Sequence, residues 1–181
     1  MSEITFGIHP RQVGNRNALR RICDTLEREV DPEVQPETVK ASIAVLKEIA
    51  CGYGYGGAID ESVLAHDVTR LEDASALPKP DLSSGEQNEA QRVCRVVENN
   101  IEPDAAKVRD LTFGGERESP LNTLMVKSWG VDCSVEALRK AACGLGFEDK
   151  KADVSDELNC LSRFSENVRV VAYDFERKYK R

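Results

Sequence analysis

The chain has 181 residues, 40% of them hydrophobic and 31% charged, with a formal net charge of −7. This composition is that of a soluble globular protein, and the acidic balance disfavours broad attraction to nucleic-acid phosphates. No apolar run approaches the ~18 residues that would span a bilayer, so we expect no membrane contact. Because the chain lacks a basic-then-apolar signal pattern, we expect it in the cytoplasm, where thiols stay reduced.

Residues 1–13 are predicted to form an extended arm. Apolar residues alternate over positions 4–8 as in a short strand, and Pro10 stops that pattern.

Residues 14–74 are predicted to form a first unit of three helices. The first helix ends before Pro32, since proline disfavours helix in the residue that precedes it. The second is expected to end at Gly52, a residue suited to a left-handed cap, and Asp60 is a favoured N-cap for the third. Their apolar stripes are Leu19, Ile22, Cys23, Leu26 and Val30; Val39, Ile43, Leu46 and Ile49; and Leu64, Val68 and Leu71.

A linker at residues 75–85, rich in proline and serine, precedes a second helical unit at residues 86–150. Ser83 and Glu86 have the spacing of a capping box at its start.

Two breaks are expected inside this second unit. Pro103 should end its first helix, as Pro32 does in the first unit. A turn should follow Trp129, with Asp132 or Ser134 capping the next helix.

An internal echo suggests that the two units are duplicates. Residues 21–33 recur as residues 92–104, and residues 60–65 match residues 132–137 at nearly the same offset. Cys23 would then be equivalent to Cys94.

Residues 151–181 are predicted to form a long C-terminal helix that Ser155 can cap. Apolar residues follow in steps of three and four, close to the spacing of a helix that packs along a partner. A strand over residues 168–175 is the alternative interpretation. We expect the stripe to face a hydrophobic surface of this chain's own bundle or of another subunit. It consists of Leu161, Phe164, Val168, Val171 and Phe175.

The cysteines and histidines form no sequence motif for a metal or cofactor. No C-x-x-C pair occurs, and neither His9 nor His66 lies in a spaced Cys/His cluster. We therefore expect no disulfide, no metal and no cofactor. The six thiols expected to be free are Cys23, Cys51, Cys94, Cys133, Cys143 and Cys160.

The glycine run at residues 52–57 contains G-x-G-x-x-G, but it follows a predicted helix rather than a strand. A flexible turn is favoured there over a dinucleotide-binding loop.

Basic residues gather at both chain ends despite the acidic total. A local anion contact is a hypothesis for the N-terminal group, although stacking platforms for bases are absent there. That group is Arg11, Arg16, Arg20 and Arg21.

Residues 129–141, WGVDCSVEALRKA, follow Glu118-Ser119-Pro120-Leu121. This stretch resembles the closing part of death-fold interaction domains, in which a helix often ends in tryptophan before a short turn and a Ser/Thr-Val helix start. The resemblance covers about residues 86–165 only. It implies homotypic helical assembly and no catalysis.

These patterns predict an all-α fold with two related small helical units, a long C-terminal helix and an extended N-terminal arm. They favour a non-catalytic interaction or assembly subunit that binds a protein partner or itself. The first alternative is a small regulator that contacts nucleic acid through its basic ends. An enzyme that uses cysteine and histidine is the second alternative.

Overall fold

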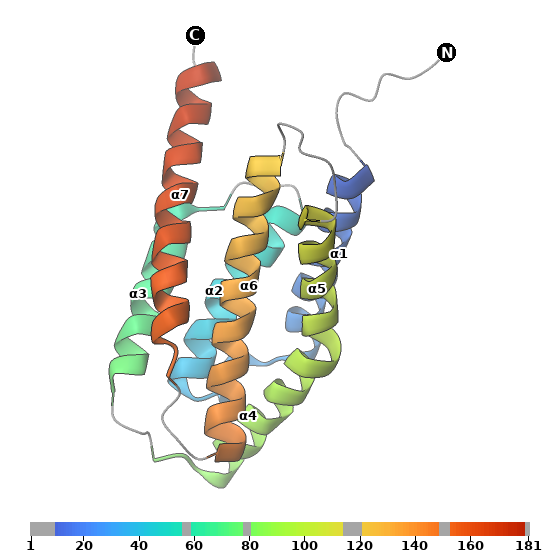
Figure 1. The fold of residues 1–181 in the computed structure, drawn as a ribbon. Helices are drawn as coiled ribbons and strands as arrows, with labels where there is room; N and C mark the ends of the chain where they lie inside the picture. The colour runs from blue at the N-terminus through green and yellow to red at the C-terminus, as the bar shows by residue number, and fades with distance from the viewer. Residues whose placement is uncertain (1–9, 56–58, 78–80, 114–120, 149–152, 180–181) are drawn as a thin grey trace.

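The computed structural model describes residues 10–55, 59–77, 81–113, 121–148 and 153–179. These residues form helices and no strand, so the all-α prediction is confirmed (Figure 1). The elements in chain order are α1 (Pro10–Glu29), the short 3-10 helix η1 (Pro32–Val34), α2 (Glu37–Gly54), α3 (Glu61–Ala76), α4 (Ser84–Val96), the π-helical turn η2 (Val97–Ile101), α5 (Glu102–Phe113), α6 (Leu121–Cys143), the π-helical turn η3 (Gly144–Glu148) and α7 (Ser155–Tyr179).

The long helices stand side by side, with α2 and α6 in the middle of the bundle (Figure 1). α2 contacts α1, α3 and α6, while α6 also contacts α5, α7 and α4. The buried apolar residues of all these helices form one cluster. The predicted units 14–74 and 86–150 therefore share a single core.

The central position of α2 explains its sequence. Its predicted stripe is buried, and Ala41, Val45 and Ala50 on its other sides are buried as well. A helix that packs on several sides is apolar around most of its circumference. The hydroxyl of the fully buried Ser42 donates to the Thr38 carbonyl at 2.8 Å.

Two predicted helix starts are confirmed. The Asp60 carboxylate accepts hydrogen bonds from the backbone N–H groups of Ser62 and Val63 at the start of α3. Ser83 and Glu86 form the predicted capping box of α4. Each cap satisfies backbone donors that the first turn of a helix leaves unpaired.

Several predicted boundaries are wrong by a few residues. α1 begins at Pro10, so residues 10–13 are helical, as suits a proline in a first turn; residues 4–8 lie outside the described residues. α3 continues to Ala76, which shortens the linker. α2 passes the predicted cap and ends at Gly54, where a Cβ atom would lie 2.9 Å from the Arg20 nitrogen. Glycine there allows α2 to approach α1 closely.

Pro103 does not end a helix. The chain runs from α4 through η2 into α5, and the Glu102 N–H donates to the Val97 carbonyl across the wider π-helical turn. Pro103 therefore occupies the first turn of α5, where a residue without an N–H is tolerated.

The turn predicted after Trp129 is also absent, because α6 is continuous through it. Ser134 does not cap a helix; its hydroxyl donates to the carbonyls of Gly130 and Val131. The Asp132 carboxylate is 3.1 Å from the Arg109 guanidinium of α5. Both polar side chains thus have partners inside a continuous helix.

The second match of the predicted duplication, between residues 60–65 and residues 132–137, does not hold in the structure. The first segment begins α3 behind its cap, whereas the second lies in the middle of α6. Cys23 and Cys94 are both buried, at 0% and 3% exposure.

α7 packs on α6 and α3. Its Glu157 is buried and lies 2.6 Å from the Lys140 ammonium of α6, and this hydrogen bond raises the pKa of Lys140. On α6, a Cβ atom at Gly130 would lie 2.5 Å from the ring of Phe164 on α7. Glycine at that position lets the aromatic ring lie directly against the α6 backbone.

No helix among the described residues combines the length and the apolar character needed to cross a bilayer.

Candidate functional site

The predicted partner stripe is divided along α7. Leu161, Phe164 and Val168 are 0%, 0% and 8% exposed and belong to the chain's own core. For these three residues the hydrophobic surface is this bundle, not another subunit. The side chains of Val171 and Phe175 lie outside the described residues, although the helix backbone continues through both positions to Tyr179.

The C-terminal turns of α7 rise beyond the ends of the neighbouring helices (Figure 1). The N-terminal half of the same helix lies between α3 and α6. α7 is therefore anchored at one end and extended at the other.

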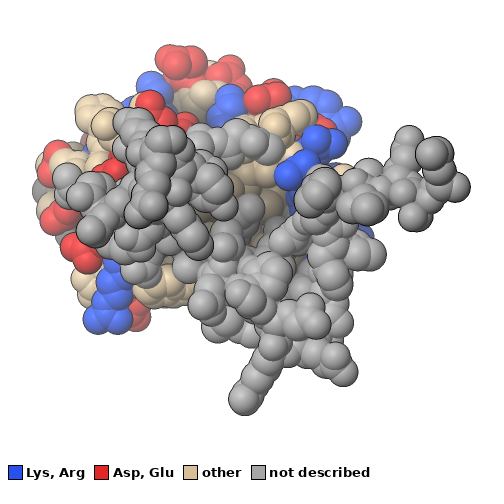
Figure 2. Space-filling model, turned by 90° about the horizontal axis from the view of Figure 1, so that it is seen from above, with Lys and Arg blue, Asp and Glu red and all other residues tan. Residues whose placement is uncertain are grey.

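Two arginines of the proposed anion contact, Arg20 and Arg21, bind different partners. Arg20 donates to the Gly54 carbonyl at 2.6 Å, whereas Arg21 pairs with Asp104 of α5 at 2.8 Å. Arg16 is half-buried, and the side chain of Arg11 lies outside the described residues. Figure 2 shows acidic and basic groups interspersed over the described part of the upper face. Arg20 and Arg21 thus join helices rather than frame a shared pocket.

The cysteines overturn the prediction of six free thiols. All six are paired, as Cys23–Cys51, Cys94–Cys143 and Cys133–Cys160. The paired Cα atoms are 5.0, 4.9 and 6.1 Å apart, which lies within the usual range for disulfides. Spacing alone could not reveal these pairs because the partners are 28, 49 and 27 residues apart.

The first pair forms a cluster with a carboxylate. Cys23 and Glu27 lie one helical turn apart on α1, so both face the same side, and Cys23 Sγ is 3.8 Å from Glu27 Oε1. Cys51 joins them from the C-terminal end of α2. Cys23 is buried, Cys51 is half-buried and Glu27 is exposed, so the cluster opens to solvent on one side.

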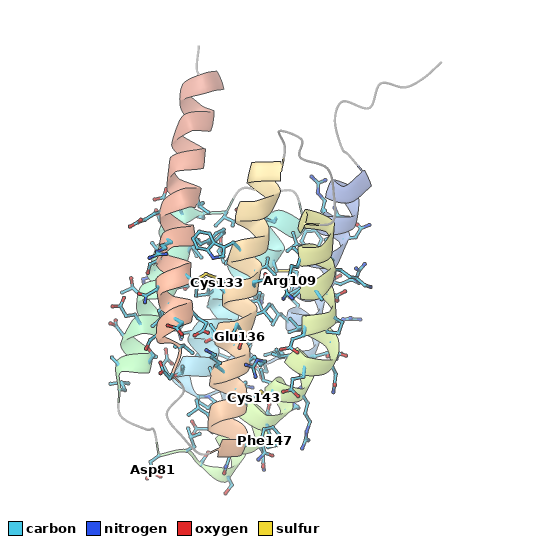
Figure 3. All side chains as sticks on the ribbon, in the orientation of Figure 1. Asp81, Arg109, Cys133, Glu136, Cys143 and Phe147 are labelled. Carbon is cyan, nitrogen blue, oxygen red and sulfur yellow. A yellow bond between two sulfur atoms is a disulfide. The ribbon has the colours of Figure 1, made fainter. Side chains whose placement is uncertain are left out.

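The second pair repeats this arrangement on other helices. Glu98 Oε1 lies 3.8 Å from Cys94 Sγ and 3.7 Å from Cys143 Sγ. Cys94 comes from α4 and Cys143 from the end of α6, where Figure 3 labels it. The burial pattern of the first cluster recurs: one cysteine is buried, the other is half-buried and the carboxylate is exposed.

A second internal repeat relates the two clusters in sequence. Residues 50–55 read ACGYGY and residues 142–147 read ACGLGF. The first echo relates Cys23 and Glu27 to Cys94 and Glu98, and the new repeat relates Cys51 to Cys143. This repeat, at an offset different from that of the echo, was the available sequence signal for the second cysteine of each cluster.

The helix ends beside the clusters also correspond. A Cβ atom on Gly146 would lie 2.7 Å from the Gln91 nitrogen, much as one on Gly54 would meet Arg20. Gln91 donates to the Gly146 carbonyl at 2.8 Å, as Arg20 does to that of Gly54. Both junctions thus combine a close backbone approach with a side-chain hydrogen bond.

An exposed aromatic residue follows each junction. Tyr55 and Phe147 are 56% and 50% exposed, and each ring contacts an arginine, Arg20 at 5.4 Å and Arg95 at 5.6 Å. The hydrogen bond that Tyr55 donates to Asp24 raises the pKa of its phenol.

The third pair, Cys133–Cys160, joins α6 to α7 (Figure 3). Among the described residues, the Cys–Glu–Cys grouping occurs only at the first two pairs. The third pair therefore differs in chemistry from the other two.

A surface hollow of about 350 Å³ lies over α3 and the start of α2. Two of its lining residues, Arg70 and Glu37, form a salt bridge with each other at 2.8 Å. Its lining consists of Glu37, His66, Thr69, Arg70, Asp73, Ala74 and Leu77. The enzyme hypothesis requires a cysteine beside a histidine. His66 lines this hollow, but no cysteine is among the lining residues. His9 lies outside the described residues.

Comparisons with protein-family models, with curated proteins and with solved structures found no significant match to this chain.

Proposed function

We propose that this chain is a non-catalytic helical assembly subunit and that the second half of α7 is its docking element. The carrying observation is the division of α7, whose first half is buried in the bundle while its last turns rise beyond the neighbouring helices. The apolar spacing of the sequence continues across this division to Val171 and Phe175. A stripe of this kind is costly to leave in water and commonly marks an interface.

A second copy of this chain is the partner that fits best. The spacing of three and four suits pairing with a like helix. Charge supports the same choice, because the chain carries −7 overall but ends in the basic residues Arg177, Lys178, Lys180 and Arg181. The basic tip of one copy would be attracted to the acidic body of another.

The resemblance of residues 129–141 to death-fold domains implies the same kind of homotypic helical assembly. The short turn after Trp129 that this resemblance requires is absent from the continuous helix α6. We therefore assign docking to α7 from the features of α7 alone. The cytoplasmic location expected from the sequence gains no support from the three disulfides, because such bonds are rare in that reducing compartment. The nucleic-acid alternative gains no support from Arg20 and Arg21, which hold α1 to its neighbours.

Val171→Asp is the variant that tests docking, with Val170→Asp as its matched control. The two changes are chemically identical, but helical register places residue 170 off the stripe. Light scattering across a concentration series should show wild type and Val170→Asp associating while Val171→Asp stays monomeric with an unchanged melting temperature. A wild type that remains monomeric at all concentrations, or a Val171→Asp variant that associates as wild type does, would refute the proposal.

A further inference from the structure

We propose that the reduced protein binds two soft divalent cations of the zinc type, one at Cys23–Glu27–Cys51 and one at Cys94–Glu98–Cys143. This inference stands independently of docking through α7. It rests on two clusters of equivalent composition at two separate helix junctions.

The sulfur–oxygen distances match those of a zinc centre. Zinc–sulfur bonds of about 2.3 Å and zinc–oxygen bonds of about 2.1 Å place sulfur and oxygen about 3.6 Å apart around a tetrahedral ion. Glu27 Oε1 lies 3.8 Å from Cys23 Sγ, and Glu98 Oε1 lies 3.8 and 3.7 Å from the sulfurs of Cys94 and Cys143. The ligand atoms of each cluster all lie within 4.8 Å of one another. Reduction would free the two sulfurs to separate around an ion.

The ligand types also select the metal class. Two thiolates with one carboxylate favour zinc over magnesium or calcium, which prefer oxygen ligands. Three protein ligands leave a fourth tetrahedral position, and the solvent-exposed side of each cluster allows water to occupy it.

A bound cation would offset negative charge that is otherwise unfavourable in each cluster. When the ion binds, both thiols lose their protons, so two thiolates and a carboxylate place three negative charges around it. A divalent cation offsets most of that charge, which is why metal binding favours deprotonated ligands. Within the described part of the chain no carboxylate joins the pair Cys133–Cys160, so we assign no ion to it.

Metal and disulfide are mutually exclusive because they use the same sulfur atoms. In exchange with a low-molecular-weight disulfide, the two cysteine sulfurs lose two electrons and form one S–S bond. The reagent disulfide gains those two electrons and, with two protons, becomes two thiols, while the cation is released. The disulfides of this structure thus represent the oxidised state of both sites.

Metal counting on the full chain tests this assignment. Protein reduced with a phosphine should be dialysed against zinc in the presence of a competing chelator and then analysed for bound metal. We expect two zinc ions per chain in wild type and none in protein oxidised with glutathione disulfide. Cobalt substitution should give the intense charge-transfer absorption of thiolate ligation.

Three variants separate these sites from general thiol binding. Glu27→Gln and Glu98→Gln each remove one exposed carboxylate with little change of shape, and each should weaken one site by about tenfold or more. The double variant Cys133→Ser/Cys160→Ser should still bind two ions. Fewer than two zinc ions on reduced wild type, unchanged affinity in both Gln variants, or loss of zinc from the Cys133/Cys160 variant would overturn the proposal.

Discussion

Replacing Phe164 with alanine is expected to lower the free energy of unfolding by about 3–5 kcal/mol. The ring is fully buried between α7 and α6 and lies against the backbone at Gly130. Removing it deletes a large apolar contact and leaves a cavity that a glycine on the facing helix cannot fill. At about 2–4 °C per kcal/mol for a chain of this size, the melting temperature should fall clearly in a calorimetric scan.

Arg163→Ala is the control for this prediction because Arg163 is the exposed neighbour of Phe164 on α7. Its effect should stay within about 0.5 kcal/mol. If Phe164→Ala has the same melting temperature as Arg163→Ala, the contact between α6 and α7 does not stabilise the fold.

Val168→Asp should destabilise the isolated chain by several kcal/mol, because it buries an unpaired carboxylate. Val168 is 8% exposed and belongs to the same core as Leu161. Chemical denaturation of dilute protein should show a lower midpoint, and the loss should not depend on protein concentration.

Ser162→Asp adds the same charge at an exposed position of α7 and serves as the control. A Val168→Asp variant with wild-type stability but impaired assembly would mean that the seam at residue 168 lies between subunits.

Apolar periodicity and local caps were sufficient to predict the all-α class and the helix starts at Asp60 and Ser83. The errors arose where tertiary contacts replaced a local signal. Ser134 resembles an N-cap in sequence, but its hydroxyl bonds to carbonyls one turn earlier inside α6. Asp132 gains a partner from α5 in Arg109, which no local pattern could indicate.

The clusters show a similar limit. Cys23 and Glu27 are visible as neighbours on one helix face, but Cys51 reaches them only through the packing of α2 on α1. Residues far apart in sequence meet through the fold, and a search for short motifs does not detect them. The repeat of ACGYGY as ACGLGF was readable from the sequence and would have connected the two clusters.

Hydrogen exchange along α7 tests the central claim that one helix is both anchored and docking. Amide exchange in wild-type protein should be measured by mass spectrometry over a wide range of protein concentration. Residues 158–168 should be protected at every concentration, because Leu161, Phe164 and Val168 hold this half of the helix in the core. Residues 169–179 should exchange fast in dilute protein and become protected as copies associate. Exchange of residues 169–179 that does not change with concentration would contradict the account.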